Sequence, residues 1–458
     1  MISRTGRILP LTEPVASLEE YITGGGGAAL SSALQRGPGA VIEEVRAAGL
    51  RGRGGAGFPT ARKWAAVRGT GSGTTYVVCN AAEGEPGTFK DRCLLRRNPY
   101  QVLEGLAIAA YAVGASRAFV AIKAHYEPEI SRLRDALEDL AEADLLGPTP
   151  VQLVLGPDEY LFGEEKATLE VIEGNEPLPR IFPPFQVGLF ARPDSRNATA
   201  VNNVETLAHV PGILSHGAEW FRSNGTDDSP GSTVFTISGD VRCPGVYELA
   251  LGLPLRVLLD VVGGGARNGG QIKAVVPGAS AGLLTADGFD TALDFESMQE
   301  AGSGLGSAGF VIYDDSACMV AALLSFARFL SIESCGQCPA CKHGTEEITE
   351  ALERIERGDG SADDLDTIET KSAKVTGGRR CALPVGAQLL VRSALTAFRD
   401  EFDAHLGKPC PLPRDLPVPK LADYDETTRQ FTYDERYRRK RPDWTYADEP
   451  ADGQERAR

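Results

Sequence analysis

The chain of 458 residues is long enough for about three domains, each with its own hydrophobic core. Its formal net charge of −16 disfavours nucleic acid and anionic membranes as partners, because either would require a basic face. No apolar run is long enough to span a bilayer and no secretory pattern begins the chain, so we expect a cytoplasmic protein without direct membrane insertion.

A glycine-rich, basic stretch at residues 49–63 is the first candidate site. Three of its glycines spell the pattern G-x-G-x-x-G: Gly52, Gly54 and Gly57. In a dinucleotide-binding fold this pattern follows a strand, whereas residues 38–48 predict a helix that ends at Gly49. Two interpretations therefore stay open. The stretch is either a loop that lets the backbone approach a phosphate or an ordinary surface loop.

Alternating strands and helices predict an α/β domain with a mostly parallel sheet over residues 1–220. The predicted strands are residues 75–79, 117–123 and 151–155. The predicted helices are residues 99–113 and the segment after Pro128. Ligands collect beyond the carboxyl ends of such strands, which indicates residues 80–87 and 156–165. The proline-rich segment 174–217 is expected to wrap this domain.

Three further segments follow in the chain. Residues 230–312 predict a small ubiquitin-like β-grasp (α+β) domain, because a hairpin is followed by a short helix and a strand at 272–276. Residues 314–406 have apolar residues at helical spacing, which predicts a four-helix bundle. Residues 407–458 are proline-rich and then densely charged. A disordered tail is the favoured interpretation, and an extended arm that clasps a partner is the alternative.

Four cysteines give the strongest chemical signal. Cys335, Cys338 and Cys341 recur every three residues in a loop, and Cys381 follows a helical hairpin. Three thiolates at this spacing can bind one side of an iron–sulfur cube while a distant cysteine completes it, whereas structural zinc more often uses two C-x-x-C pairs. We therefore favour a [4Fe-4S] cluster over zinc. The other cysteines are predicted to be small apolar core residues: Cys79, Cys93, Cys243, Cys318 and Cys410.

Several motifs, in this order, together resemble one family. They are residues 49–63, residues 80–87, Gly163-Glu164-Glu165, Pro183-Pro184-Phe185, Asn202-Asn203-Val204-Glu205-Thr206 and Glu333-Ser334-Cys335-Gly336-Gln337-Cys338. The chain is similar to the flavin- and NADH-binding subunit of respiratory complex I and to its relatives in NAD-reducing hydrogenases and NAD-dependent formate dehydrogenases. The resemblance covers roughly residues 15–405.

This resemblance implies FMN, NAD(H) and a [4Fe-4S] cluster as cofactors. The implied acids near the flavin and nicotinamide are Glu164 and Glu165. The implied cofactor-binding residues are Gly52, Arg53, Gly54, Gly55, Gly57, Phe58, Lys63, Asn80, Glu83, Glu85, Gly163, Phe185, Asn202 and Asn203. The implied cluster ligands are Cys335, Cys338, Cys341 and Cys381.

The activity implied is that of a NADH dehydrogenase (diaphorase) subunit. NADH releases two electrons at once whereas the cluster accepts one, so a flavin is needed between them. The leftover cysteines do not suffice for a second cluster. The resemblance therefore implies a separate thioredoxin-like [2Fe-2S] subunit within a larger redox complex, through which the chain would be peripheral to the membrane.

The sequence departs from the family's pattern around the predicted site. Ala82 stands where an Asp is usual and Phe162 where a Cys is usual. Three further departures are Asp158-Glu159 for a small Gly-Ala pair, Lys166 for a Thr and Phe182 for a Lys. These changes leave two alternatives open: the same module in a formate dehydrogenase or hydrogenase, and a non-catalytic paralogue that keeps only the cluster.

Overall fold

A four-stranded parallel sheet forms the centre of the first unit in the computed structural model, which describes residues 5–71, 73–378, 380–412 and 414–447. In spatial order its strands are β3 (Val151–Gly156), β2 (Arg117–Lys123), β1 (Tyr76–Ala81) and β4 (Thr199–Asn203). All neighbouring strands run parallel, so their carboxyl ends meet at one edge of the sheet. The predicted α/β sheet and three of its strands are confirmed, with small shifts at their ends.

Strand β4 corrects the prediction for residues 174–217. This segment was expected to be irregular, but Thr199–Asn203 pairs with β1 and leads directly into the buried helix α9 (Val204–His216). Helix α6 (Pro99–Val113) packs closely on α9, because a Cβ atom at Gly105 would lie 2.0 Å from the carbonyl oxygen of Leu207. The prolines before residue 194 hid a strand too short to give a periodic signal.

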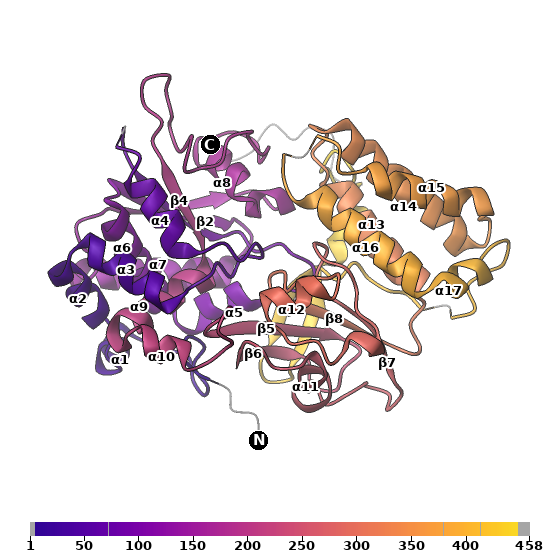
Figure 1. Cartoon of the computed structure of the whole chain (residues 1–458), viewed down its shortest axis with the longest axis horizontal. Helices are drawn as coiled ribbons and strands as arrows, with labels where there is room; N and C mark the ends of the chain where they lie inside the picture. Colours follow the sequence, from indigo (N-terminus) through magenta and orange to yellow (C-terminus); the bar gives the residue numbers. More distant parts are fainter. Residues whose placement is uncertain (1–4, 72, 379, 413, 448–458) are drawn as a thin grey trace.

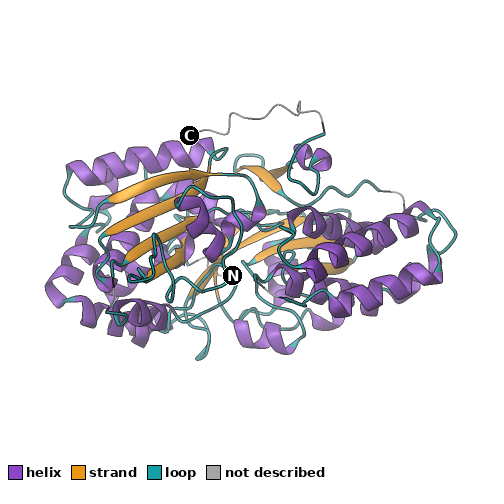
Figure 2. Ribbon diagram, turned by 90° about the horizontal axis from the view of Figure 1, so that it is seen from above, coloured by secondary structure: helices purple, strands orange, loops and turns teal. Residues whose placement is uncertain are grey.

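Helices cover both faces of this sheet (Figure 2). Along β1, Val77 and Cys79 pack in the core formed with α6 and α9, whereas Val78 packs in a second cluster with Phe162 and Leu169. This alternation follows from the two-residue period of a strand. The remaining helices of the unit are α1 (Leu18–Thr23), α2 (Ala28–Arg36), α3 (Pro38–Ala48), α4 (Thr60–Arg68), α5 (Lys90–Arg97), α7 (Glu127–Glu142), η1 (Tyr160–Gly163), α8 (Glu165–Ile172) and α10 (Ala218–Arg222).

The second unit has the expected β-grasp character with one strand more than predicted. Its sheet has the order β6 (Gly245–Ala250), β5 (Ser232–Gly239), β8 (Gly309–Asp314) and β7 (Ile272–Val276). Strands β5 and β8 are parallel and the two outer pairs are antiparallel. Its short helical segments are α11 (Leu255–Val257), η2 (Leu258–Val262), η3 (Ala286–Gly288) and α12 (Phe295–Glu300).

The third unit is the helical bundle, and it lies at the opposite end of the molecule from the parallel sheet (Figure 1). Its helices are α13 (Met319–Glu333), α14 (Pro339–Arg357), α15 (Ala362–Lys374), α16 (Leu383–Ala397) and the short α17 (Arg399–Ala404). Their apolar faces form one core with part of the β-grasp unit, as the 3.6-residue spacing predicts. None of the helices described has the length and apolar character needed to cross a bilayer.

The C-terminal arm, residues 414–447, is ordered against the rest of the chain. It contains the antiparallel hairpin of β9 (Leu421–Asp425) and β10 (Gln430–Tyr433), followed by η4 (Glu435–Arg439). Three of its side chains are buried: Lys420, Tyr437 and Lys440. The favoured prediction of a disordered tail is therefore wrong for these residues. Residues 448–458, which the same prediction included, lie outside the described part of the chain.

The arm contacts all three units of its own chain. Arg414 Nη1 donates to Asp240 of the β-grasp unit at 2.9 Å, and Arg92 Nη2 of α5 donates to the Leu421 carbonyl at 2.8 Å. Trp444 Nε1 donates to the carbonyl of Ile332 in α13 at 2.9 Å. In Figure 1 its yellow ribbon passes between the units. The arm therefore binds the chain together rather than extending away from it.

Candidate active site

The carboxyl ends of β1 and β4 bring three asparagines to one edge of the sheet. Asn80 Nδ2 donates to the carbonyl oxygen of Gly163 at 2.7 Å, and Asn202 Oδ1 accepts from Trp64 Nε1 at 2.9 Å. Asn203 caps α9, with Oδ1 accepting from the N–H of Glu205 at 3.0 Å. The register of the parallel sheet, in which Asn80 lies opposite Asn203, thus explains why residues distant in the chain share this edge.

A buried ionic network that the sequence did not reveal lies behind Asn203. Lys90 Nζ lies 2.7 Å from a carboxylate oxygen of Asp91 and 2.9 Å from one of Glu205, and all three side chains are almost fully buried. Asn203 donates to Asp91 at 2.6 Å and accepts from Lys90 at 3.1 Å. Although burial acts to raise it, the nearby Lys90 lowers the pKa of Glu205 to about 2. The only sequence signal was the charged run from Lys90 to Arg92, which has no apolar period.

The glycine-rich loop closes on itself above this edge. The N–H of Gly52 donates to the Phe58 carbonyl at 2.9 Å, and the N–H of Arg53 donates to Thr206 Oγ1 at 2.8 Å. Among the residues that the structure describes, the N–H groups of Gly54 and Gly55 have no hydrogen-bond acceptor. Two free amides next to each other in a loop can bind an anion such as a phosphate.

Gly57 shows why this loop needs glycine. Its φ is +61°, in the left-handed region, and a Cβ atom would lie 2.7 Å from the ring of Phe295 in α12. Arg53 connects the same two units, because its buried guanidinium donates to the carbonyls of Pro230 and Ser232 at 3.1 and 3.2 Å. The side chain of Arg53 is therefore occupied by protein atoms, and the loop is held between the parallel sheet and the β-grasp unit.

Three charged residues connect α4 with the start of α8. Lys63 Nζ lies 2.9 Å from Glu165 Oε2 and donates to the carbonyl of Val201, also at 2.9 Å. Glu164 is the N-cap of α8 and accepts from the N–H groups of Lys166 and Ala167. Burial raises the pKa of Glu164 to about 7. Glu164 and Glu165, although adjacent, therefore have different electrostatic surroundings: one is buried at a helix start and the other is paired with a lysine.

Two other predicted acids are occupied by protein groups. Glu83 is buried and accepts from the N–H of Asp91 at 3.0 Å and from Arg92 Nε at 3.3 Å, so it caps α5. Glu85 accepts from Tyr160 OH at 2.6 Å and from the N–H of Ala279 at 2.7 Å. Burial raises the pKa of Glu85 despite these donors. Both carboxylates thus position loops at the sheet edge, and Glu85 links that edge to the β-grasp unit.

The two predicted aromatic contacts are separated by the length of a strand. Phe58 and Phe185 are 41% and 38% exposed, which is unusual for phenylalanine and leaves a ring face for a ligand. The loop of Phe185 bonds to the first residue of β4, since the N–H of Thr199 donates to the Pro184 carbonyl at 2.9 Å. At about 3.3 Å per residue, β4 places that loop about 13 Å from Asn203. An extended ligand would be needed to contact both Asn203 and Phe185.

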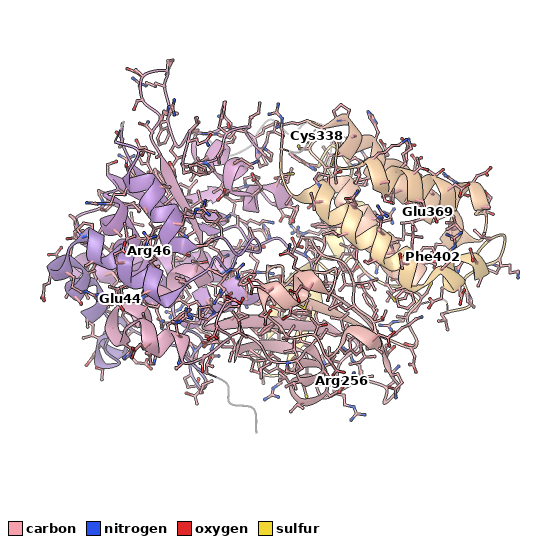
Figure 3. All side chains as sticks on the ribbon, viewed as in Figure 1. Glu44, Arg46, Arg256, Cys338, Glu369 and Phe402 are labelled. Atoms are coloured by element: carbon pink, nitrogen blue, oxygen red, sulfur yellow. The ribbon has the colours of Figure 1, made fainter. Side chains whose placement is uncertain are left out.

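The four predicted cluster cysteines surround one hollow. Its lining consists of Leu161, Ser334, Cys335, Gly336, Cys338, Cys341, Arg380, Cys381, Leu383 and Pro384. Cys338 caps α14 and Cys341 lies in its first turn, so a local loop presents three thiols, and Cys381 arrives just before α16. Figure 3 shows Cys338 at the end of the bundle that faces the parallel-sheet unit. Four thiols around one hollow, with apolar walls, fit a cubane cluster and its preference for thiolate ligands.

The segment that joins the sheet edge to this hollow is η1 with the start of α8. Leu161 of η1 lines the hollow, and Lys166 Nζ donates to the carbonyl oxygen of Arg380, next to Cys381. Tyr160 contributes on the other side, since its N–H donates to Glu333 Oε2 at 3.0 Å, just before the cysteine loop. The structure thus places the predicted flavin-side residues and the cysteine hollow on neighbouring surfaces of one short segment.

Comparison with known proteins agrees with this arrangement. Residues 45–212 match the Nuo51 FMN-binding domain, and residues 321–405 match the NADH-ubiquinone oxidoreductase-F iron-sulfur binding region. The second F-type subunit of the NADH-quinone oxidoreductase of Rhizobium meliloti is 44% identical over 407 residues, which cover 86% of this chain and 96% of that relative. The chain belongs to the family of NADH-quinone oxidoreductase F subunits.

Relatives of these F subunits differ in their redox partners. The NADP-reducing hydrogenase subunit HndC of Solidesulfovibrio fructosivorans is 38% identical over 407 residues, covering 86% of this chain and 82% of that one. The crystal structure of NAD+-reducing [NiFe]-hydrogenase in the air-oxidized state superposes with a TM-score of 0.76 at 36% identity, covering 86% of this chain. The present chain spans 66% of that hydrogenase chain.

The residues present fit the FMN and [4Fe-4S] cluster of this family. Free amides at Gly54 and Gly55, with the nearby cation of Lys63, suit a flavin phosphate. The four thiols around one hollow suit the cluster. The expected resemblance, fold class, enzyme class and cofactors are thereby confirmed.

Ala82, the most prominent departure from the family's pattern, does not face the flavin side. Its methyl group is 1% exposed and packs in the apolar cluster of Val78, Phe162 and Leu169. Phe162, a second departure, fills the same cluster. The two changes therefore occur together in one packed region, and the expectation that Ala82 mainly alters the flavin pocket does not match its surroundings.

Restoring the usual acid is expected to destabilise this chain. Ala82→Asp should lower the free energy of unfolding by about 1–3 kcal/mol, because it places a carboxylate in an apolar cluster without donors. Urea denaturation would measure the change, with Ala66→Asp on the exposed face of α4 as the matched control of smaller effect. A variant as stable as the wild type would show that the new carboxylate reaches the flavin side instead.

Asp158, a third departure, anchors the C-terminal arm. Its carboxylate lies 3.0 Å from Lys420 Nζ, and Tyr446 OH is 3.4 Å away, both in the arm. Although burial acts to raise it, Lys420 and Lys123 hold the pKa of Asp158 well below its usual value. Asp158 therefore stays ionised and pairs with the segment that follows the family's common region. Phe182, in contrast, is 55% exposed and has no packing role.

Proposed function

We propose that this chain is the electron-input subunit of a multi-subunit NADH oxidoreductase. It takes a hydride from NADH onto FMN and delivers single electrons through its [4Fe-4S] cluster to a partner subunit. When bound, FMN accepts the electron pair, and the cluster passes electrons one at a time. The single observation that carries the proposal is the continuity of η1 and α8 from the sheet edge to the cysteine hollow.

We assign the predicted residues to roles that suit their surroundings. The free amides of Gly54 and Gly55, with Gly52, Gly57 and Lys63, would hold the FMN phosphate, and the asparagines at the sheet edge would hold the flavin ring. Gly163 keeps the loop against β1, since a Cβ atom there would lie 2.8 Å from the Ala82 carbonyl. The exposed rings of Phe58 and Phe185 would contact the adenine part of an extended NADH.

The two adjacent acids would act at the nicotinamide end. Glu164, whose pKa burial raises to about 7, can change its charge near neutral pH, whereas Glu165 is paired with Lys63. An acid of this kind can bind the carboxamide or ribose of NADH while limiting negative charge next to the flavin. Glu83, Glu85 and Arg53 would support these groups through the contacts described above, without contacting the ligands through their side chains.

The partner would be a separate thioredoxin-like [2Fe-2S] subunit. The chain has nine cysteines, of which four surround the cluster hollow. Electrons from that cluster need an acceptor beyond this chain. The partner subunit would bring the chain to the membrane periphery in a complex I, or to a hydrogenase or formate dehydrogenase in the related assemblies.

An NADH titration of the full chain tests the function. The chain, reconstituted with FMN, iron and sulfide, is expected to bleach its flavin absorption when NADH is added and to reduce ferricyanide with NADH. A flavin that binds but stays oxidised would contradict the function and favour a cluster-bearing scaffold. Failure to bind flavin after reconstitution would contradict both the function and the site.

Lys63 allows a sharper test of the flavin site. Lys63→Gln is expected to weaken FMN affinity about tenfold, because a charge-assisted hydrogen bond to phosphate contributes more than a neutral one. Affinity for riboflavin, which has no phosphate, should change much less. Fluorescence titration with both flavins measures the difference, and Lys408→Gln on the exposed segment after α17 is the matched control. Equal losses for the two flavins would remove Lys63 from the phosphate site.

A further inference from the structure

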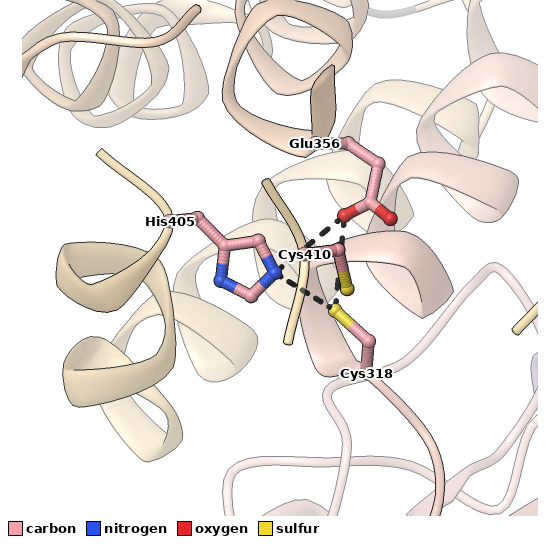
Figure 4. Close-up of side chains that lie close together, drawn as sticks. All are labelled: Cys318, Glu356, His405 and Cys410. Carbon is pink, nitrogen blue, oxygen red and sulfur yellow. Dashed lines mark hydrogen bonds and ion pairs between the residues drawn. The ribbon is translucent and has the colours of Figure 1, made fainter. Parts of the chain in front are cut away.

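Four side chains capable of binding a metal meet at a second place in the bundle. Cys318 caps the start of α13, Glu356 lies in the last turn of α14, His405 follows α17, and Cys410 lies in the segment that leads to the C-terminal arm. Their ligand atoms all lie within 4.8 Å of one another. Figure 4 shows the four side chains converging from three helices and this segment. The prediction that Cys318 and Cys410 are simple apolar core residues omitted this arrangement.

This group is separate from the cluster hollow. Cys318 precedes the 15 residues of α13 and the cysteine loop follows them. At 1.5 Å per residue, the two places are about 22 Å apart along the helix. Three residues that link the two ends, Ala322, Phe326 and Leu330, are buried core residues. The four side chains thus cannot contribute to the iron–sulfur cluster and need an explanation of their own.

The distances between the ligand atoms fit a tetrahedral ion. Cys318 Sγ lies 3.3 Å from His405 Nε2 and 3.7 Å from Glu356 Oε2, and the last two atoms are 3.8 Å apart. Zinc bonds of about 2.3 Å to sulfur and about 2.0–2.1 Å to nitrogen or oxygen imply ligand separations of about 3.4–3.6 Å in a tetrahedron. Little movement would therefore be needed to admit the ion.

The histidine is already oriented for this role. His405 Nδ1 lies 2.6 Å from the carbonyl oxygen of Glu401, which can only accept, so Nδ1 has the proton. The lone pair of Nε2 therefore faces Cys318 and Glu356. A histidine ligand whose other nitrogen donates to a carbonyl is the usual arrangement around a bound metal. Glu401 is itself held by Lys273, whose Nζ lies 2.6 Å from its carboxylate.

We propose that Cys318, Glu356, His405 and Cys410 bind one structural zinc ion. Two thiols and an imidazole favour zinc over magnesium or calcium, which prefer oxygen ligands. Binding would displace the two thiol protons to solvent and leave Zn²⁺ bound to two thiolates, one imidazole and one carboxylate. Four protein ligands leave no position for a substrate, so the ion would be structural.

The position of the site indicates what the ion would stabilise. Cys410 lies four residues before Arg414, the first residue of the C-terminal arm. Cys318 begins the helix whose far end, at Glu333, receives Lys440 of that arm. A zinc ion here would fix the start of the arm to the bundle and would close a loop of about 90 residues between Cys318 and Cys410, which restricts the unfolded chain.

Elemental analysis of the purified full chain with its cluster tests the proposal. One zinc per chain is expected beside the cluster iron. His405→Gln and Cys410→Ser should lose the zinc and keep the iron, whereas Cys381→Ser should lose the iron and keep the zinc. Cys243→Ser, on the half-exposed cysteine of the β-grasp hairpin, is the matched control and should keep both metals.

A milder variant guards against misfolding. Glu356→Gln keeps the shape of a half-buried side chain and should weaken zinc retention at least about tenfold in competition with a chelator, with the iron unchanged. Zinc absent from the native chain and not taken up on titration would overturn the proposal. So would zinc that leaves with Cys381, iron in place of zinc at this site, or a disulfide between Cys318 and Cys410 revealed by thiol titration.

Discussion

Replacement of Lys440 by alanine is expected to lower the free energy of unfolding by about 3–5 kcal/mol, because it leaves a carboxylate buried without its cationic partner. Lys440 Nζ lies 2.8 Å from Glu333 Oε1, and both side chains are 1% exposed. The OH of Tyr437 and the N–H of Tyr160 also donate to Glu333, but they bring no full charge. The loss should therefore detach the C-terminal arm from α13.

Urea denaturation of the chain with its cofactors, together with limited proteolysis of the arm, would measure this change. Arg256→Ala, which removes a surface ion pair with Asp290, is the matched control and should not shift the transition. The double variant Lys440→Ala with Glu333→Ala should lose less stability than the sum of the single variants, because no charge stays buried. A Lys440→Ala chain as stable as the control would contradict the structural role of the pair.

Cys381→Ser is expected to remove the cluster and to reduce electron delivery to the partner subunit by about two orders of magnitude or more. The serine is close in size, so the bundle should stay folded, but it replaces one of the four thiolates around the hollow. NADH oxidation by ferricyanide should change far less, since that acceptor can take electrons from the flavin side. The separation of the two activities is the expected signature.

Iron analysis and absorption near about 400 nm, where thiolate-bound iron clusters absorb, would follow the cluster. Cys243→Ser again serves as the control, because Cys243 is half-exposed in the β-grasp unit and remote from the hollow. If Cys381→Ser retained full iron and full electron delivery, Cys381 would not be a ligand. If both activities were lost equally, the variant would affect the flavin side and the proposed division of roles would be wrong.

The C-terminal arm gives this member of the family a feature of its own. The family regions end at residue 405, whereas the arm begins at Arg414. Asp158, one of the departures from the family's pattern, pairs with Lys420 of the arm. Changes that seemed to alter a ligand site thus form contacts within the protein instead. The non-catalytic alternative, which was based on these departures, loses part of its support from Ala82 and Asp158.

The sequence by itself determined the elements whose signals are local. Helices α3 and α6 begin at a proline and end at a glycine, as predicted, and β2 spans the predicted residues. The spacing of Cys335, Cys338 and Cys341 depends on one loop and one helix start, so it also indicated the cluster correctly. These features depend on residues within a few positions of one another, which is why composition and spacing suffice for them.

Only the tertiary structure decided how distant residues meet. β4 was missed because five residues after a proline-rich segment have no period, although pairing with β1 stabilises them. Arg53 and Glu83 were expected at the ligand, but packing directs Arg53 to the β-grasp unit and Glu83 to α5. Glu333 and Lys440 are 107 positions apart, and Cys318 and His405 are 87 apart. Such contacts depend on the packing of whole units, and residue spacing along the chain contains no information about them.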